Sequence, residues 1–322
     1  MNRNIQGHLC MAIAAACWGL MAPLGKDAMA HGISGFDMVG IRVTGGALCF
    51  WLASLFVKYV KGKKTENNNN TAENEDKITK KEYLRLFGAA LFAIVFNQCN
   101  YIVGLSITSP LNASIMTTTM PIITMVLAAI IIREPITWKK LGGVILGASG
   151  AATLILASAG GVKEGGVLLG DLMCIGGQLS YAIYLTAFKD VISRHSAITC
   201  QKWMMTFAAL AVLPFALPSL IEVPWQELSA TTYAETAFVV LGGTFLSFLC
   251  CTTAQQILRP TVIAMYNYMQ PIVACIVSVM IGIGVFGWSH AVAAGLVFLG
   301  VYLVNASKAK ASERIADSKV ES

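Results

Sequence analysis

The sequence has little charge. Of its 322 residues only 12% are Asp, Glu, Lys or Arg, while 56% are hydrophobic, and the mean hydropathy is +0.66. Soluble domains usually carry about 25% charged and roughly 45–50% apolar residues. A soluble enzyme could not keep this much apolar surface away from water, so the composition predicts a polytopic membrane protein.

Motifs for catalysis and for metal binding are also lacking. The nine cysteines are scattered singly, apart from the adjacent pair Cys250 and Cys251, and no C-x-x-C or Cys/His spacing occurs. The four histidines lie in loops or at span ends, and no G-x-S-x-G, H-E-x-x-H or P-loop pattern is present. The sequence therefore predicts no metal, no cofactor and no disulfide framework, and it argues against an intramembrane enzyme.

Carboxylates at mid-membrane depth are missing as well. All 17 acidic residues fall in loops or toward the ends of the apolar stretches, including Glu134 and Glu235. Proton pumps and proton-coupled transporters commonly use an embedded carboxylate. This distribution argues against a buried carboxylate relay, although carboxylates at span ends could still line a wet cavity.

What the chain does contain is long apolar stretches. A spanning helix needs about 20 mostly apolar residues. The first stretch includes Trp18, Pro23 and Lys26 and has no cleavage site after it, which favours a retained helix over a signal peptide. The predicted spans are 7–29, 36–57, 83–105, 110–132, 138–158, 166–188, 198–220, 234–257, 261–283 and 288–307.

The Lys and Arg residues predict the orientation. Cytoplasmic loops carry an excess of positive charge, and with both termini in the cytoplasm only Lys26, Arg42 and Lys163 of the 23 positive residues lie clearly outside. We expect a multi-pass protein of the cell (inner) membrane with cytoplasmic N- and C-termini. Residues 58–82 are predicted to be a disordered cytoplasmic loop and 308–322 a polar cytoplasmic tail. The positives form no basic patch with aromatics, so no nucleic-acid partner is expected.

The chain contains an internal repeat. Residues 7–26 align without gaps on 170–189, an offset of 163, and the segment from Pro110 aligns on the segment from Pro260, an offset of 150. Each half holds five spans, an odd number, so the second half must insert upside down. The predicted fold is an all-α polytopic membrane protein with ten transmembrane helices as two inverted five-helix repeats. The predicted repeats are 7–157 and 166–307.

Three short patterns resemble a known family. They are A-x-x-C-W-G-x-x-A-P-x-G-K at 14–26, S-P-L-N-A-S…P at 109–121 and R-E-P at 133–135. Together they resemble the EamA family of the drug/metabolite transporter superfamily, over both halves. Its members have ten helices, and the resemblance implies export of amino acids or other small metabolites. It also allows a homodimer through spans five and ten. One departure is that Glu134 aligns with Gly284.

Polar side chains inside the spans mark candidate binding positions, because such groups are costly against lipid. Hydrogen bonding between helices, or to the helix's own backbone for threonine, is the structural alternative. With the offset of 150, Asn267 aligns with Thr117, so polar groups recur at equivalent places. The candidate substrate-binding residues are Trp18, Asn97, Asn100, Tyr101, Thr117, Gln178, Tyr181, Tyr184, Tyr266, Asn267 and Gln270.

Two prolines and two basic residues within the spans each have a structural and a functional interpretation. Pro121 and Pro271 each remove a helix hydrogen bond, so they are candidate hinges, or kinks that make room for a cavity. Lys26 and Arg42 lie near the outer ends of their spans. Local pairing with Asp27 or Asp37, or snorkelling, is favoured for them over attraction of a substrate carboxylate.

The favoured hypothesis is a secondary transporter that exports small metabolites such as amino acids, by alternating access around a midplane cavity between the repeats. The alternative is a membrane channel or a non-transporting membrane subunit. Aromatic and amide side chains without a deep charge disfavour a highly charged substrate. The expected partners are a small-molecule substrate and the lipid bilayer.

Overall fold

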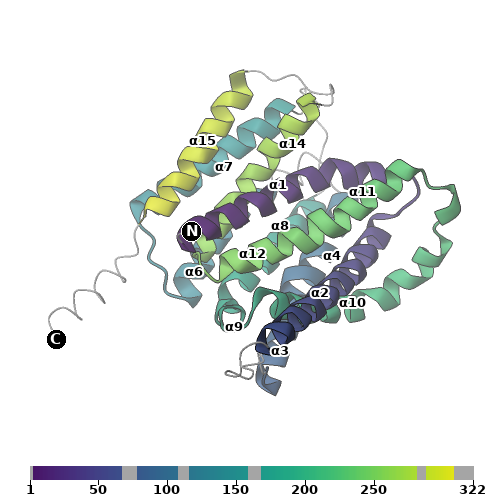
Figure 1. Ribbon diagram of the computed structural model, residues 1–322. Coiled ribbons are helices and arrows are strands. Elements are labelled where there is room, and N and C mark those ends of the chain that lie inside the picture. The colour runs from purple at the N-terminus through teal and green to yellow at the C-terminus, as the bar shows by residue number, and fades with distance from the viewer. Residues whose placement is uncertain (1–2, 67–77, 108–115, 159–167, 281–287, 308–322) are drawn as a thin grey trace. The chain divides into compact units, whose positions relative to one another are not determined.

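The computed structural model describes residues 3–66, 78–107, 116–158, 168–280 and 288–307 (Figure 1). In these ranges the chain is helical and contains no strand, which confirms the all-α class. The first-half helices are α1 (Arg3–Ala30), α2 (Gly35–Glu66), α3 (Lys80–Ala90), η1 (Leu91–Phe96), α4 (Asn97–Ile107), α6 (Met120–Ile131) and α7 (Trp138–Ser158). The second-half helices are α8 (Leu168–Ala187), α9 (Lys189–Arg194), α10 (Ala197–Glu222), η2 (Trp225–Glu227), α11 (Ala230–Val240), η3 (Leu241–Leu246), α12 (Ser247–Gln255), α13 (Pro260–Met265), η4 (Tyr266–Tyr268), α14 (Met269–Met280) and α15 (Trp288–Ala306).

Several of these helices suit a membrane. Four described stretches are long and apolar enough to cross one: Gly35–Val60, Leu168–Ala187, Ala197–Glu222 and Ala230–Gln255. Shorter apolar helices occur at Met120–Ile131 and Ala291–Ala306. The described residues therefore support a polytopic membrane protein, while the count of ten spans stays a prediction.

The predicted disordered loop is partly helical. Helix α2 continues to Glu66, and α3 begins at Lys80. The middle of that loop, 67–77, and the predicted tail, 308–322, lie outside the described residues. Charged Lys and Glu residues are good helix formers, so the apolar helix α2 extends past its predicted end at residue 57.

Polar caps begin the helices that lead into spans three and eight. Thr79 caps α3 in a capping box: its hydroxyl accepts from the Glu82 N–H at 3.3 Å, and the Glu82 carboxylate accepts from the Thr79 N–H at 2.9 Å. Ser229 caps α11, accepting from the Thr232 N–H at 3.1 Å. Such caps satisfy N–H groups that have no partner inside the helix. Thr79 and Ser229 are 150 residues apart, so the repeat offset found for spans four and nine also holds here.

The chain forms two compact units, and each contains helices of both sequence halves. Unit 1 comprises Met1–Gln98 and Phe188–Ile257, and unit 2 comprises Cys99–Ala187 and Leu258–Ser322. The boundaries of the units therefore differ from the boundaries of the two repeats. Because each unit contains helices of both repeats, equivalent helices of the two repeats can contact each other within one unit.

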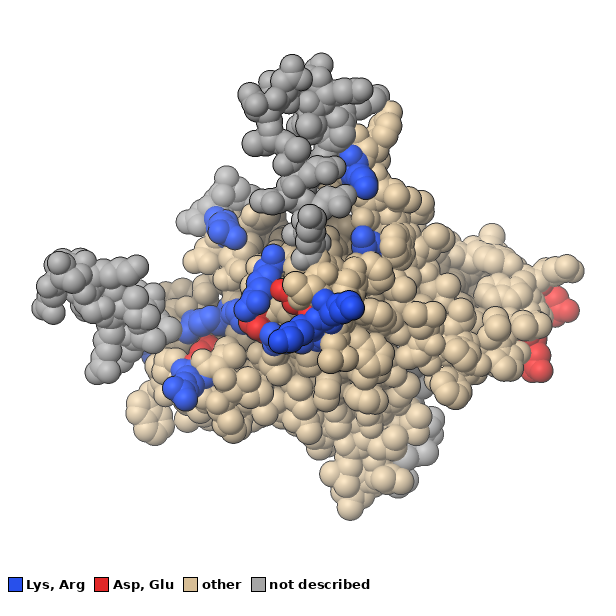
Figure 2. All heavy atoms as spheres, turned by 90° about the horizontal axis from the view of Figure 1, so that it is seen from below, with Lys and Arg blue, Asp and Glu red and all other residues tan. Residues whose placement is uncertain are grey.

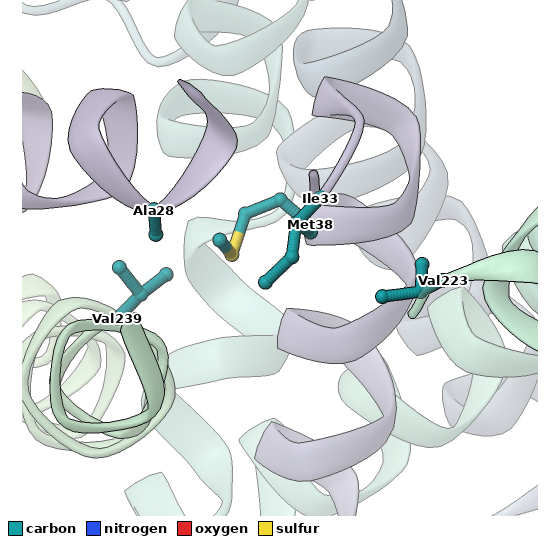
Figure 3. Close-up of a cluster of buried hydrophobic side chains, with 5 residues drawn as sticks. All are labelled: Ala28, Ile33, Met38, Val223 and Val239. Carbon is teal, nitrogen blue, oxygen red and sulfur yellow. The ribbon is translucent and has the colours of Figure 1, made fainter. Parts of the chain in front are cut away.

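In unit 1, α2 packs along α10, and α1 packs against α11, η3 and α12. A hydrophobic cluster fills one end, where α1, α2 and α11 meet the chain after α10: Ala28, Ile33, Met38, Val223 and Val239, which we call the end cluster. Figure 3 shows these side chains directed toward one another. The cluster lies at the predicted outer ends of these helices.

In unit 2, α7 and α15 lie side by side (Figure 1) and approach closely through glycines. A methyl group at Gly143 would lie 2.7 Å from the Gly300 carbonyl oxygen, and one at Gly150 would lie 2.8 Å from the Ala293 carbonyl oxygen. The offset of 150 converts the first contact into the second, because it takes Gly143 onto Ala293 and Gly150 onto Gly300. One contact that occurs twice in this way is the geometric signature of a local two-fold axis between inverted repeats.

Ion pairs hold helix ends together in both units, and Figure 2 shows basic side chains beside acidic ones on the surface. In unit 1, Arg85 of α3 pairs with Asp190 of α9. In unit 2, the buried Glu134 carboxylate lies 3.0 Å from the Lys140 ammonium and 3.7 Å from the Arg259 guanidinium. Glu134 belongs to the R-E-P pattern, so that pattern provides a buried anchor for α7 and for the start of α13.

Candidate functional site

Two π-helical segments interrupt spans three and eight at equivalent places. The segments are η1 (Leu91–Phe96) and η3 (Leu241–Leu246), and the offset of 150 takes one onto the other residue by residue. π-Helical turns are rare and frequently occur at functional sites. Both segments belong to unit 1.

The η3 segment leaves a backbone carbonyl that Trp18 uses. The Trp18 indole N–H donates to the Gly243 carbonyl at 3.2 Å. Its ring also packs edge-on against Phe248, with ring centroids 5.9 Å apart. Trp18 therefore fixes α1 beside the π-helical segment of span eight, through a residue that the sequence predicted to be a cavity wall.

A small cavity lies between the two π-helical segments. It is lined by α2, by both segments and by the helices that follow them, together with α10: Val39, Arg42, Val43, Ile94, Gln98, Met205, Thr244 and Phe248. We call it the two-fold cavity, because six of its lining residues form three repeat-equivalent pairs: Arg42 with Met205 (offset 163), and Ile94 with Thr244 and Gln98 with Phe248 (offset 150). Both repeats thus contribute to the cavity, with five lining residues from the first and three from the second.

Arg42 is the charged group of this cavity. Its Nε–H donates to the Thr244 hydroxyl at 3.1 Å, and an Nη1–H donates to the Gln98 side-chain oxygen at 3.2 Å. Arg42 lies seven residues after the start of α2, about 10 Å along the helix axis. Insertion scales put the cost of an arginine at the centre of a spanning helix at about 2.5–3.5 kcal/mol, and the cost is lower near the end of a span. The two hydrogen bonds satisfy two of the five N–H donors of Arg42, and the side chain also lines the cavity.

The predicted local pair of Arg42 with Asp37 is not formed. The Asp37 carboxylate accepts from the Ser34 hydroxyl at 2.5 Å and from the Ser219 hydroxyl. Asp37 thus links the start of α2 to the end of α10, while Arg42, five residues later on α2, lines the cavity. The predicted pairing of Arg42 with Asp37 is therefore wrong, whereas snorkelling of Arg42 stays a prediction.

Of the predicted substrate-binding residues, two lie in unit 1. Trp18 packs against the cavity wall, and Asn97 accepts at its side-chain oxygen from the Gln98 amide at 3.1 Å. The structure thus brings Trp18, Asn97, Gln98 and Arg42 into one neighbourhood of contacts. Of these four, only Trp18 and Asn97 are predicted from the sequence to bind substrate.

The other predicted binding residues lie in unit 2. Tyr181 and Tyr184 are buried in α8 with ring centroids 5.4 Å apart, and the Gln270 amide donates to the Asn267 side-chain oxygen at 3.0 Å. Asn100 faces Gly176 of α8 across a close helix contact. Their role in binding stays a prediction. The predicted residues of this group are Asn100, Tyr101, Thr117, Gln178, Tyr181, Tyr184, Tyr266, Asn267 and Gln270.

The predicted hinge prolines adjoin breaks in their helices. Pro121 stands at the start of α6, directly after a turn at Thr118–Thr119. Pro271 lies in the first turn of α14, after the 3-10 segment η4. The Tyr268 hydroxyl donates to the Thr118 carbonyl at 3.0 Å, and these two residues are repeat mates. Both spans are therefore discontinuous near the local axis of unit 2, whereas hinge motion itself stays a prediction.

Comparison with known proteins agrees with this architecture. The model of the EamA-like transporter family matches residues 5–156 and 168–306, once in each half. A crystal structure of another protein is similar with a TM-score of 0.73 at 17% identity, covering 97% of this chain and 99% of that one. At this identity the likeness shows the fold alone.

Relatives in sequence carry transporter names. The chain is 24% identical to the uncharacterized transporter YyaM of Bacillus subtilis (62% of this chain, 66% of the relative), and 27% identical to the uncharacterized transporter YcxC of the same organism (66% and 69%). The matched stretches thus span about two thirds of these relatives. Because the family model covers nearly the whole chain in two repeats, the protein belongs to the EamA-like transporter family.

Proposed function

We propose that this membrane transporter is a secondary carrier that exports small metabolites, such as amino acids, by alternating access around a cavity between its two repeats. The observation that carries the proposal is the two-fold cavity, which both π-helical segments line. Inverted-repeat carriers hold their substrate between the repeats, where discontinuous helices leave backbone groups free. Membership of a transporter family also favours transport over catalysis.

Alternating access needs a barrier that can open on either side of the site. The end cluster supplies one, because Met38 precedes Arg42 by one turn on α2 and packs with Ala28 and Val239 of α1 and α11. Apolar packing of this kind separates the cavity from the predicted outer side. The helix breaks next to Pro121 and Pro271 are places where backbone angles could change during opening.

We further propose an inner-membrane location with both termini in the cytoplasm. In unit 1, the basic residues Arg85 and Arg194 lie near the start of α10, whereas Glu222 and Glu227 lie at its far end. Helix α10 has 26 residues, about 39 Å at 1.5 Å per residue. This separation of charge supports the orientation with the basic end inside.

Efflux from proteoliposomes tests the carrier. Purified full-length protein is reconstituted, the vesicles are loaded with a mixture of amino acids, and release is followed by mass spectrometry. We expect saturable release of one class, which competing substrate slows. Trp18→Ala should reduce it, because the variant loses the bond to Gly243 and the contact with Phe248. The matched control is Trp138→Ala, since Trp138 is 87% exposed.

Two results would contradict the proposal. Release that rises linearly with concentration and shows no competition would indicate a channel. Equal loss of release in Trp18→Ala and Trp138→Ala would show that tryptophan removal acts through general destabilisation and not through the cavity.

A further inference from the structure

The charge of Arg42 is uncompensated in the part of the chain that the structure describes. Its two hydrogen-bond partners, Thr244 and Gln98, are neutral, and no described carboxylate pairs with it. Asp37, the acid next to it on α2, is engaged by Ser34 and Ser219. Charged side chains within membrane-spanning segments are rare and commonly mark substrate or ion pathways, so an anionic ligand is a natural partner for this cation.

The guanidinium still has donors for such a partner. Arginine carries five N–H donors in a planar fork, and the bonds to Thr244 and Gln98 use two, which leaves three, including both on Nη2. A carboxylate can accept two parallel hydrogen bonds from this fork. Thr244 and Gln98 also hold the plane of the guanidinium, so its orientation is fixed before a ligand arrives.

The apolar lining residues of the two-fold cavity determine which group can accompany a carboxylate in the ligand. Apart from Arg42, Gln98 and Thr244, the cavity is lined by Val39, Val43, Ile94, Met205 and Phe248. The polar residues are not symmetric: the repeat mates of Arg42 and Gln98 are Met205 and Phe248. The site therefore has one cationic side and one apolar side, which matches the chemistry of a ligand with a single carboxylate and a short apolar tail. The cavity has a volume of about 10 Å³, so such a ligand enters only once the helices that line it move apart.

We propose that Arg42, positioned by Gln98 and Thr244, binds the carboxylate of a small monocarboxylate with a branched apolar tail. This inference rests on the proposed carrier and names the substrate class of the two-fold cavity. The carboxylate replaces the missing counter-charge, and Val39, Ile94 and Met205 contact the tail. An amino acid and a 2-oxo acid share this chemistry, so the test has to separate them.

The test measures binding to purified full-length protein by calorimetry with three probes of equal tail. The probes are 4-methyl-2-oxopentanoate (carboxylate alone), leucine (carboxylate and ammonium) and leucinamide (ammonium alone). For Arg42→Gln, we expect the affinity for the carboxylate probe to fall by at least about tenfold, the minimum for a hydrogen bond to a charged group. Arg42→Lys keeps the charge but loses the fork, so its affinity should be intermediate. Lys139→Gln is the control, since Lys139 is exposed on α7.

A second variant keeps the test valid if Arg42→Gln does not fold. Gln98→Glu places a carboxylate against Arg42, 3.2 Å from Nη1 in the present geometry, and should strengthen that contact while blocking the ligand. The comparison variant, Gln98→Leu, removes one of the two bonds that position Arg42 but adds no carboxylate. Carboxylate binding should be lost in Gln98→Glu and only weakened in Gln98→Leu.

Each outcome has a definite meaning. Binding of 4-methyl-2-oxopentanoate and leucine, but not of leucinamide, supports the site, and the tighter of the two identifies the source of the carboxylate. Equal weakening of all probes in Arg42→Gln, or no binding of either carboxylate by the unmodified protein, overturns it. Saturable efflux of neutral solutes with no dependence on Arg42 would refute the carboxylate site while the carrier stands. Absence of any saturable efflux would refute the carrier itself.

Discussion

Alanine at Gly143 should loosen the packing of α7 against α15, whereas alanine at the adjacent Gly142 should not. A methyl group at Gly143 would lie 2.7 Å from the Gly300 carbonyl oxygen, 2.8 Å from the Val304 side chain and 3.0 Å from Leu303. Heavy atoms prefer about 3.5–4.0 Å, so the two helices would have to separate. At Gly142 no atom lies within 4 Å of the added methyl group.

The expected magnitude follows from two opposing terms. Overpacking typically costs about 1–3 kcal/mol, while replacing glycine by alanine within a helix gains about 0.8–1 kcal/mol. The Gly142→Ala variant should therefore be slightly more stable than the unmodified protein. The Gly143→Ala variant should be less stable than the Gly142→Ala variant by about 1–3 kcal/mol. Thermal unfolding of both variants in one detergent measures this difference. Gly300→Ala should behave like Gly143→Ala, because its methyl group would meet the Gly143 carbonyl at 2.6 Å. Equal stability of the Gly142 and Gly143 variants would refute the close packing.

Two further predictions concern charged groups outside the cavity. Glu134→Gln should destabilise the protein by about 3–5 kcal/mol, because Lys140 is fully buried and loses its charged partner at 3.0 Å. The double variant Glu134→Gln/Lys140→Met should recover thermal stability. An unchanged melting temperature in the single variant would contradict this prediction. The N–H and hydroxyl of Thr79 donate to the Glu82 carboxylate and lower the pKa of Glu82. The ionised Glu82 carboxylate therefore stabilises the fold above the ordinary glutamate pKa of about 4.3, and this stabilisation is lost as the pH falls through the lower folded-state pKa. Melting temperatures measured from about pH 6 down to about pH 3 should therefore converge for the unmodified protein and Glu82→Gln at the acidic end, and a constant gap would count against the capping box.

Hydropathy predicted most helix bounds closely. The prediction of 138–158 matches α7 (Trp138–Ser158), and 166–188 differs from α8 (Leu168–Ala187) by two residues or fewer at each end. Length and apolarity decide these elements, and both can be counted in the sequence. The inverted duplication was also visible, because prolines, tryptophans and glycines recur at constant offsets.

The two-fold cavity was not predictable in the same way. A π-helical turn arises from a shift of backbone hydrogen bonds. The two segments, L-F-A-I-V-F and L-G-G-T-F-L, share no residue pattern that marks such a turn in the sequence. Arg42 was judged by its neighbours in sequence, whereas its partners Thr244 and Gln98 are 202 and 56 residues away. The available signal was the offset of 150 applied to span three, which would have aligned Thr79 with Ser229 and Gln98 with Phe248.

The paired π-helical segments have a consequence for how the halves arose. Each such turn accommodates about one additional residue, and removing one residue from a helix rotates everything beyond it by about 100°. A deletion in η1 would thus turn Gln98 away from the cavity, and a deletion in η3 would turn Phe248 away from it. Because both halves carry the extra residue at the same repeat position, we infer that the insertion was already present in the ancestral five-helix chain. The π-helical turns that line the cavity would then be older than the duplication itself.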